Sequence, residues 1–241
     1  MNVLIITGGS KGIGKGIAEY YAANDYLVYS LSRTKSNLKK CEEVEVDILD
    51  LPLAEQKLNY ILHKIDFNYV DKITLINNAG RLGKIASLGN LNASDIDTSI
   101  KLNTTVPLVL SNLFIDATKD LKSEKQIINI SSGAAANPYV GWSVYCTSKA
   151  AIDMMTRTIA LEQEGLANGV NCMSIYPGVV DTNMQTQIRS TSIEDFKNVD
   201  RFIGLKQNNE LYTPEYVGQR IYEMDHGQQL NNGDILDIRY K

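Results

Sequence analysis

A tyrosine and a lysine four residues apart, Tyr145 and Lys149, are the pair in this sequence best suited to acid–base chemistry. On a helix this spacing places both side chains on one face. An ammonium beside a phenol favours the phenolate and lowers the pKa of the tyrosine from its ordinary value of about 10. Lowering that pKa by about three units takes roughly 4 kcal/mol. An exposed ion pair does not supply this energy, but a desolvated cleft that holds two cations does.

Two serines and an asparagine complete a possible reactive set around this pair. Ser131 and Ser132 follow an apolar run, and Ser132 precedes Tyr145 by thirteen residues. A serine hydroxyl there would hydrogen-bond the oxygen that the tyrosine protonates, while Asn103 would link Lys149 to water. The set predicts hydride transfer from a cofactor to a carbonyl carbon. Singly, each residue has an ordinary alternative as a helix-surface pair, a strand end or a solvated amide.

A glycine-rich segment near the start of the chain suits a phosphate group. Residues 7–14 read TGGSKGIG, between an apolar run and an amphipathic segment. Gly8 and Gly12 can adopt backbone angles closed to other residues, and Gly14 lets a helix pack closely on a strand. Free N–H groups at the helix start would bind a pyrophosphate. The predicted contacts are Gly8, Ser10, Lys11, Gly12, Ile13 and Gly14; the alternative is a tight turn without a ligand.

The turn after the second apolar run indicates which dinucleotide binds. An NAD site expects an acid about 20 residues past the glycine loop, but residues 26–41 contain no Asp or Glu. Ser32, Arg33 and Thr34 stand there instead, and a guanidinium with hydroxyls suits a 2′-phosphate. We therefore predict NADP(H), with Lys11 as a second cation; a solvated basic turn is the alternative. Later strand ends add Asp47, Ile48, Asn78, Ala79 and Gly80 as predicted nucleotide contacts.

Short apolar runs alternate with helix-period segments along the whole chain. Ile13, Ile17 and Tyr21 form one helical stripe, and residues 150–164 form a longer helical stretch. The alternation predicts one α/β domain over residues 1–241, a Rossmann-like doubly wound parallel sheet of about seven strands with helices on both faces. Residues 181–212 are polar and lack a period, so we expect a loop that forms a substrate lid or is disordered. The expected strands are 3–6, 27–31, 44–46, 73–76, 127–130, 170–175 and 235–238.

Composition excludes several other classes of protein. The chain has 241 residues, is 44% hydrophobic and carries a net charge of -4, which disfavours a nucleic-acid partner. No apolar run approaches ~18 residues, so no membrane span is expected, and the first six residues predict a strand instead of a signal peptide. Three cysteines without CxxC spacing favour a reducing cytoplasm and predict no metal site. Neither His63 nor His226 lies in a nucleophile motif.

These motifs resemble those of the short-chain dehydrogenase/reductase superfamily over nearly the whole chain. The matching segments are TGGSKGIG at 7–14, NNAG at 77–80, NISS at 129–132, YCTSK at 145–149 and PGVVDT at 177–182. The resemblance implies a catalytic tetrad and a nicotinamide contact after the last motif. It also implies a homodimer or homotetramer. The implied tetrad is Asn103, Ser132, Tyr145 and Lys149, three of which also touch the cofactor (Asn103, Tyr145, Lys149), and the nicotinamide contacts are Pro177, Gly178, Val180 and Thr182.

Residues 132–142 and 180–185 are similar to the sepiapterin reductase-like branch of that superfamily, in particular to bacterial benzil reductases. This likeness implies NADPH-dependent reduction of a ketone or of one carbonyl of an α-diketone. Candidate pocket residues are Ser132, Tyr139, Trp142, Tyr176 and Met184, which are core or dimer contacts in the alternative interpretation. Gly9 stands where many members carry alanine, and no consequence is expected from it.

Two other functions compete with this prediction. Reduction of a 3-oxoacyl thioester on an acidic carrier protein is disfavoured by the negative net charge. A cofactor-sensing regulator without catalysis is disfavoured because both Tyr145 and Lys149 are present.

Overall fold

Seven parallel strands form the central sheet of this protein. The computed structural model describes residues 1–227 and 231–240, and the strand order within them is β3-β2-β1-β4-β5-β6-β7. The predicted doubly wound parallel sheet is therefore confirmed, with the order reversing between β1 and β4. The strands are β1 (Asn2–Thr7), β2 (Tyr26–Ser32), β3 (Cys41–Glu45), β4 (Lys72–Asn77), β5 (Glu124–Ile130), β6 (Asn171–Tyr176) and β7 (Ile235–Asp237).

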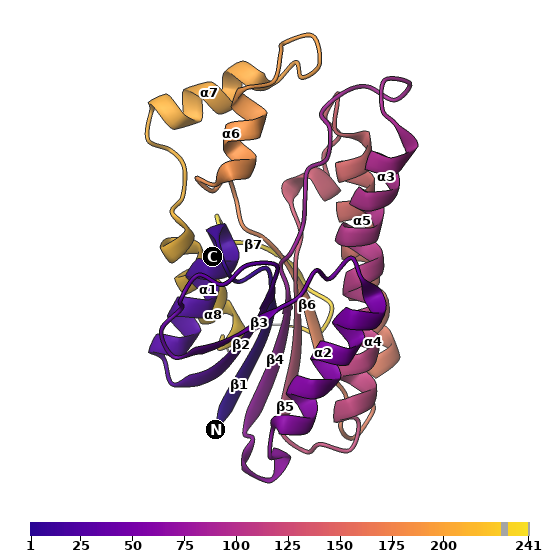
Figure 1. The fold of residues 1–241 in the computed structure, drawn as a ribbon, viewed down its shortest axis with the longest axis vertical. Coiled ribbons are helices and arrows are strands. Elements are labelled where there is room, and N and C mark those ends of the chain that lie inside the picture. Colours follow the sequence, from indigo (N-terminus) through magenta and orange to yellow (C-terminus); the bar gives the residue numbers. More distant parts are fainter. Residues whose placement is uncertain (228–230, 241) are drawn as a thin grey trace.

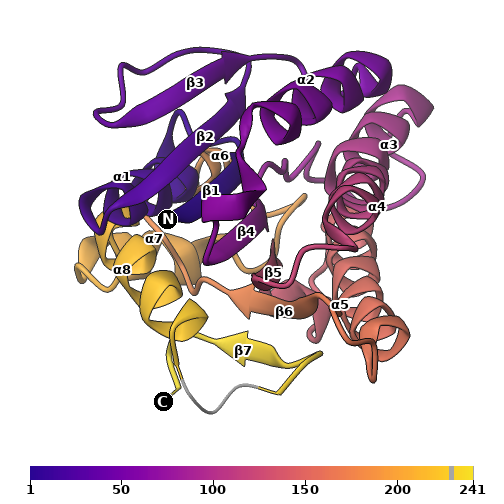
Figure 2. The same ribbon diagram turned by 90° about the horizontal axis from the view of Figure 1, so that it is seen from below.

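Helices cover both faces of the sheet (Figures 1 and 2). Helices α1 and α8 lie on one face, and α2, α4 and α5 lie on the other, with α3 beside α5. In the described residues, no helix is long and apolar enough to cross a lipid bilayer. The helices are α1 (Gly12–Ala23), α2 (Leu51–Lys64), α3 (Ala93–Ile100), α4 (Val106–Thr118), α5 (Ser143–Gln163), α6 (Asn183–Arg189), α7 (Val199–Gln207) and α8 (Pro214–Asp225), with short turns η1 (Phe67–Tyr69), η2 (Lys101–Thr105) and η3 (Gly133–Ala135).

The alternation of side chains along β1 explains the two layers. Val3 and Ile5 pack into the core under α2, α4 and α5, whereas Leu4 and Ile6 pack under α1 and α8. All four side chains are fully buried, because a parallel strand in the middle of such a sheet has no solvent face. The continuous apolar runs in the sequence reflect this arrangement.

The prediction of a loop over residues 181–212 is wrong, because this segment contains α6 and α7. Phe196 and Phe202 are buried in a small apolar cluster together with Trp142. The segment is closed at its base, where Asp181 N donates to Tyr212 O and Tyr212 N donates to Val179 O, both at 2.9 Å. Figure 1 shows α6 and α7 standing beyond one end of the sheet. Both helices are short and polar outside, so helical periodicity is weak in this part of the sequence.

A polar cluster fixes the opposite, amino-terminal edge of the sheet. The buried carboxylate of Asp225 accepts hydrogen bonds from Tyr21 Oη at 2.9 Å and Thr74 Oγ1 at 3.3 Å. Lys72 forms an ion pair with the same carboxylate at 3.0 Å. Both hydroxyls donate to Asp225 Oδ2, and Oδ1 has the Lys72 ammonium as its partner, so the buried carboxylate is held by hydrogen bonds and by charge, as a low-dielectric interior requires.

Candidate active site

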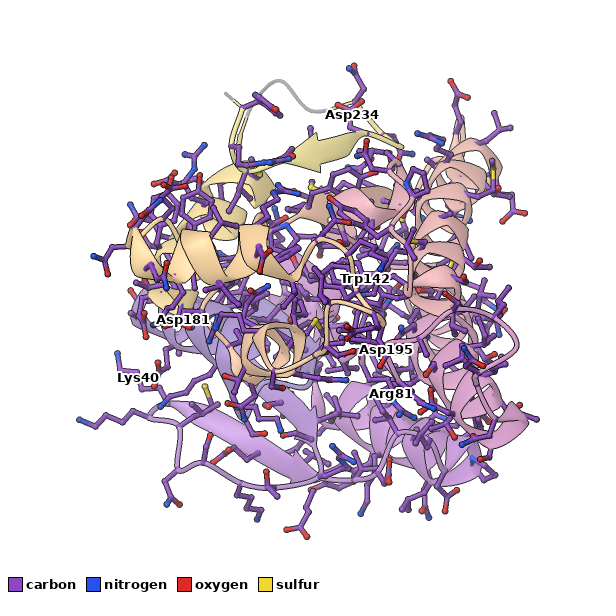
Figure 3. The ribbon with its side chains drawn as sticks, turned by 90° about the horizontal axis from the view of Figure 1, so that it is seen from above. Lys40, Arg81, Trp142, Asp181, Asp195 and Asp234 are labelled. Atoms are coloured by element: carbon purple, nitrogen blue, oxygen red, sulfur yellow. The ribbon has the colours of Figure 1, made fainter. Side chains whose placement is uncertain are left out.

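A cavity of about 380 Å³ opens at the carboxyl ends of the strands. Its walls come from the ends of β5 and β6, from the start of α5 and from the segment with α6 and α7. In Figure 3 Trp142 lies near the middle of this end of the molecule, between α5 and the α6–α7 segment. Predicted site residues that line the cavity are Ile13, Asn78, Gly80, Ser132, Tyr139, Trp142, Tyr145, Lys149, Tyr176, Pro177, Gly178, Val180, Thr182 and Met184.

Tyr145 and Lys149 lie on one face of α5, as their spacing predicted. The ammonium of Lys149 lies 5.8 Å from the centre of the Tyr145 ring and donates to the Ile130 carbonyl at 2.7 Å. Both residues are buried. The last carbonyl of β5 therefore fixes the lysine beside the phenol.

Burial dominates the electrostatics of this pair. It raises the pKa of Tyr145 to about 12, against a hydrogen bond with Ser132 that lowers it. It also lowers the pKa of Lys149 to about 8, although the carboxylate of Asp153 opposes this shift. The phenol is therefore protonated at neutral pH, and the lysine is the group that titrates near it.

The two serines at the end of β5 have different positions. Ser132 lines the cavity, and its Oγ accepts from Ala134 N at 3.2 Å, at the start of η3. Ser131 Oγ points to the helix and donates to the Lys149 carbonyl at 3.3 Å. Ser132 is thus the serine whose hydroxyl lies beside the Tyr145 phenol.

Asn103 sits in the π-helical turn η2, between α3 and α4. Its side chain contacts Arg81 of the segment after β4 and Ser148 of α5. A Cβ added to Gly80 would lie 3.3 Å from Asn103 Oδ1 and 3.6 Å from Lys149 Nζ. Asn103 and Lys149 therefore approach the same glycine, although no direct bond joins them.

The glycine loop has the shape of a cradle that side chains would fill. Gly8 and Gly12 have φ values of +72° and +54°. A Cβ on Gly14 would collide with the Gly8 carbonyl, so the first turn of α1 packs directly on the loop. The start of α1 follows this loop directly, and the free backbone N–H groups of a helix start suit a pyrophosphate. These residues therefore fit a dinucleotide.

Gly9 has a structural reason that the sequence did not indicate. A Cβ on Gly9 would collide with Ser30 Oγ, which is fully buried beneath it on β2. An alanine at this position would therefore force the neighbouring serine to shift.

The turn after β2 brings the predicted 2′-phosphate residues to the same edge. Thr34 Oγ1 lies 3.4 Å from Ser10 Oγ of the glycine loop. Arg33 and Lys11 are both exposed to solvent there. The nearby carboxylate of Glu43 accepts from Ser36 N and Leu38 N, so it is occupied in closing the turn. A local cationic surface with hydroxyl groups results.

The remaining predicted nucleotide contacts divide into two groups. Asn78 Nδ2 donates to Thr7 O at 2.9 Å, and Ala79 N donates to Thr7 Oγ1 at 3.0 Å, which join this segment to the glycine loop. Asp47 is exposed and accepts from Leu49 N. The Ile48 side chain instead packs in the core, so only its backbone faces the edge.

Aromatic residues form one wall of the cavity. Trp142 stacks on Phe196 at 4.7 Å and meets the Tyr145 ring edge-on at 5.7 Å. The side chains are thus both core and cavity wall. Sequence reasoning did not single out Leu82, Gln185, Ile188, Arg201, Phe202 and Arg239 as lining residues. Four of them lie within residues 181–212, the segment expected to form the substrate lid, whereas the sequence offered no signal for Leu82 and Arg239.

Comparison with known proteins defines the class. Residues 2–193 match the family model of the short chain dehydrogenases. The chain therefore belongs to the short-chain dehydrogenase/reductase family, oxidoreductases that act on carbonyl or CH–OH groups and bind a nicotinamide dinucleotide.

Individual proteins of known sequence or structure show more specific similarities to this chain. The chain is 41% identical over 242 residues to a benzil reductase ((S)-benzoin forming) of Bacillus subtilis, covering 99% of both chains. It is 30% identical to the sepiapterin reductase of Meriones unguiculatus, covering 98% of this chain and 95% of that protein. The solved structure of a Saccharomyces cerevisiae short-chain dehydrogenase/reductase, YIR035C, shares the fold with a TM-score of 0.85 at 24% identity, covering 99% of this chain and 96% of that one.

Proposed function

We propose that this protein reduces a ketone or α-diketone carbonyl to the alcohol with NADPH, and that Tyr145 is the proton donor. The observation that carries the proposal is one cavity lined by Ser132, Tyr145 and Lys149 together with aromatic side chains. The diketone in the proposal comes from the name of the Bacillus subtilis relative.

The fit of the glycine cradle supports a bound dinucleotide. The amides of residues 8–14 would hold the pyrophosphate, and Arg33 with Lys11 and the hydroxyls of Ser32 and Thr34 would hold the 2′-phosphate. Asp47 would accept from the adenine, Pro177 and Gly178 would contact the cofactor, and Val180 and Thr182 would contact its carboxamide. When bound, the cofactor supplies a hydride to the carbonyl carbon.

The residues of the chain supply the proton and orient the substrate. Because burial raises the pKa of Tyr145 to about 12, its phenol holds the proton at neutral pH. It donates that proton to the substrate oxygen, which Ser132 also hydrogen-bonds. The ammonium of Lys149 stabilises the phenolate left behind and holds the ribose hydroxyls.

The cavity walls favour an aryl or other apolar substituent. Tyr139, Trp142 and Phe202 provide flat apolar surfaces, and Met184 provides an adaptable one. Ser132, Tyr145 and Lys149 are neighbours in this lining, so a carbonyl would bind beside them with its substituent against the rings.

Consumption of NADPH with a panel of α-diketones, matched monoketones, sepiapterin and acyl thioesters tests the proposal. We expect turnover with the diketones, and a loss of kcat of roughly 10²–10⁴-fold in Tyr145→Phe, the usual contribution of a general acid. Cofactor affinity should change little in that variant. Normal turnover by Tyr145→Phe would disprove the mechanism, and no consumption with any carbonyl would favour a cofactor sensor.

We also propose that the chain assembles as a homodimer or homotetramer through α4 and α5. Leu108 on α4 and Met154 and Leu161 on α5 are large apolar side chains that are 47%, 60% and 70% exposed, which supports this. Light scattering of the purified protein tests it; a monomer at micromolar concentration would contradict it.

A further inference from the structure

Asp153 is a buried acid that lies four residues after Lys149 on α5. It is 6% exposed. Its Oδ1 accepts from Ser174 Oγ at 2.9 Å, and its Oδ2 accepts from the Tyr176 hydroxyl. Both donors belong to β6, so the carboxylate joins the middle of α5 to the carboxyl end of that strand.

The position of Asp153 relates it to the lysine of the candidate site. Residues four apart on a helix are neighbours on one face, so the carboxylate lies on the same side of α5 as the Lys149 ammonium. Lys149 is itself buried, at 5% exposed. A buried ammonium needs an opposite charge nearby, because burial in low dielectric disfavours its charged form.

The other groups around the two residues do not supply this charge. Lys149 faces the Ile130 carbonyl and the Tyr145 ring, and its backbone accepts from Ser131. Asn103 approaches it as a neutral amide. Asp153 faces Ser174 and Tyr176. More remote charges, Arg157 on α5 and Asp237 on β7, act on the Tyr176 hydroxyl.

We propose that Asp153 is a positioning residue of the reductase site, whose buried carboxylate keeps the Lys149 ammonium charged and ties the end of β6 to α5. The proposal rests on the proposed function of Lys149. The pKa of Lys149 supports it, since Asp153 is the group that opposes the downward shift caused by burial.

The second half of the proposal concerns the cavity wall. Tyr176 lines the cavity and is followed directly by Pro177 and Gly178, which are proposed to contact the cofactor. By accepting a hydrogen bond from the Tyr176 hydroxyl, Asp153 fixes the position of the residue at which β6 ends. One carboxylate thus acts on two sides of the site without touching substrate.

The variant Asp153→Asn removes the charge and keeps nearly the same shape. Its amide oxygen still accepts from one of the two hydroxyls, and the other hydroxyl must turn to accept from the amide nitrogen. Affinity for NADP⁺, measured by titration calorimetry between pH 6 and 9, should weaken with rising pH in both proteins as Lys149 loses its proton. In Asp153→Asn we expect that weakening to begin about one pH unit lower, with up to about tenfold poorer affinity at the same alkaline pH. The alkaline limb of kcat/KM should move by the same amount.

Asp225→Asn is a matched control, because Asp225 is also buried and accepts from a tyrosine and a threonine hydroxyl, at the other edge of the sheet. It should lower stability and leave the pH profile in place. An unshifted profile in folded Asp153→Asn, or equal shifts in both variants, would overturn the proposal.

The double variant Asp153→Asn with Lys149→Met covers the case in which Asp153→Asn does not fold. If an unpaired buried ammonium causes the failure, removing it should restore folding, which supports the proposal; continued failure would overturn it. The calorimetry needs no turnover, so a failure of the proposed carbonyl reduction, seen as no NADPH consumption by the unmodified protein, is a separate result.

Discussion

Asn103 and Arg81 exchange two hydrogen bonds: Arg81 N donates to Asn103 Oδ1 at 2.9 Å, and Asn103 Nδ2 donates to Arg81 O at 2.8 Å. The same Nδ2 donates to Ser148 Oγ at 3.0 Å, and Ser148 Oγ donates to the Tyr145 carbonyl at 2.8 Å. One amide therefore connects the segment after β4 to the helix that carries Tyr145 and Lys149. The π-helical turn η2 is what directs this side chain inward.

Replacing Asn103 with alanine should reduce both stability and turnover. It leaves two partly buried backbone groups of Arg81 without partners, which costs about 2 kcal/mol of unfolding free energy. With the anchor gone, we expect kcat to fall more than about tenfold. Chemical denaturation and steady-state kinetics measure the two effects. Asn24→Ala, which removes an exposed amide bonded to Tyr20 O at 2.8 Å, should change stability by less than about 0.5 kcal/mol.

Arg33→Glu should reverse the preference between the two nicotinamide dinucleotides. The change removes a charge-assisted bond and places a carboxylate against the 2′-phosphate, so we expect kcat/KM with NADPH to fall by about 100-fold. NADH should be used as well as before or better. Lys122→Glu makes the same charge change on an exposed residue before β5, at the opposite edge of the sheet. Equal losses in both variants would show a general charge effect and contradict the assignment.

The contact of Gly9 with Ser30 predicts a non-additive pair of substitutions. Gly9→Ala forces a methyl group against the buried Ser30 Oγ and should cost about 1–3 kcal/mol of unfolding free energy, as overpacking does. Ser30→Ala in the same chain should recover part of that loss, because it removes the atom in conflict. A double-mutant cycle by urea denaturation measures the coupling. Strict additivity would refute the steric explanation.

Stability should depend on pH through Lys149. Burial lowers its pKa to about 8, below the value of about 10.4 in an unfolded chain. Between these two values the unfolded chain binds more protons than the folded one, so the contribution of Lys149 to stability rises with pH across that window. Below pH 8 the free-energy cost of burying the charged Lys149 side chain is fully present, at about 3 kcal/mol.

Comparison with Lys149→Met isolates this effect from other titrations. As the pH rises from about 8 to about 10.4, the unmodified chain should gain stability relative to Lys149→Met. The difference in unfolding free energy between the two proteins should therefore narrow. Denaturant unfolding at a series of pH values measures it. A difference that stays constant over this range would mean that the lysine is not desolvated.

Much of the fold could be predicted, because parallel strands that are buried on both faces have continuous apolar sequences. β3 begins three residues earlier than expected because Cys41–Glu43 are mixed in polarity on an edge strand. Spacing and resemblance predict the tetrad, and the structure brings Ser132, Tyr145 and Lys149 together in one cavity. The Asn103–Arg81 exchange, the place of Asp153 and the cavity position of Arg239 could not be predicted, because each depends on a contact between residues far apart in sequence or on a helix face defined only by packing.

The closure of residues 181–211 at the bridge between Val180 and Tyr212 has a consequence for variation. Because the two ends of this segment meet at one point, the segment is equivalent to an insertion that leaves the sheet unchanged. Strand register therefore constrains neither its length nor its composition. Homologous chains could exchange the whole segment, by recombination or by grafting. They would then gain a different substrate preference, while the residues of the candidate active site on the sheet and on α5 stay unchanged.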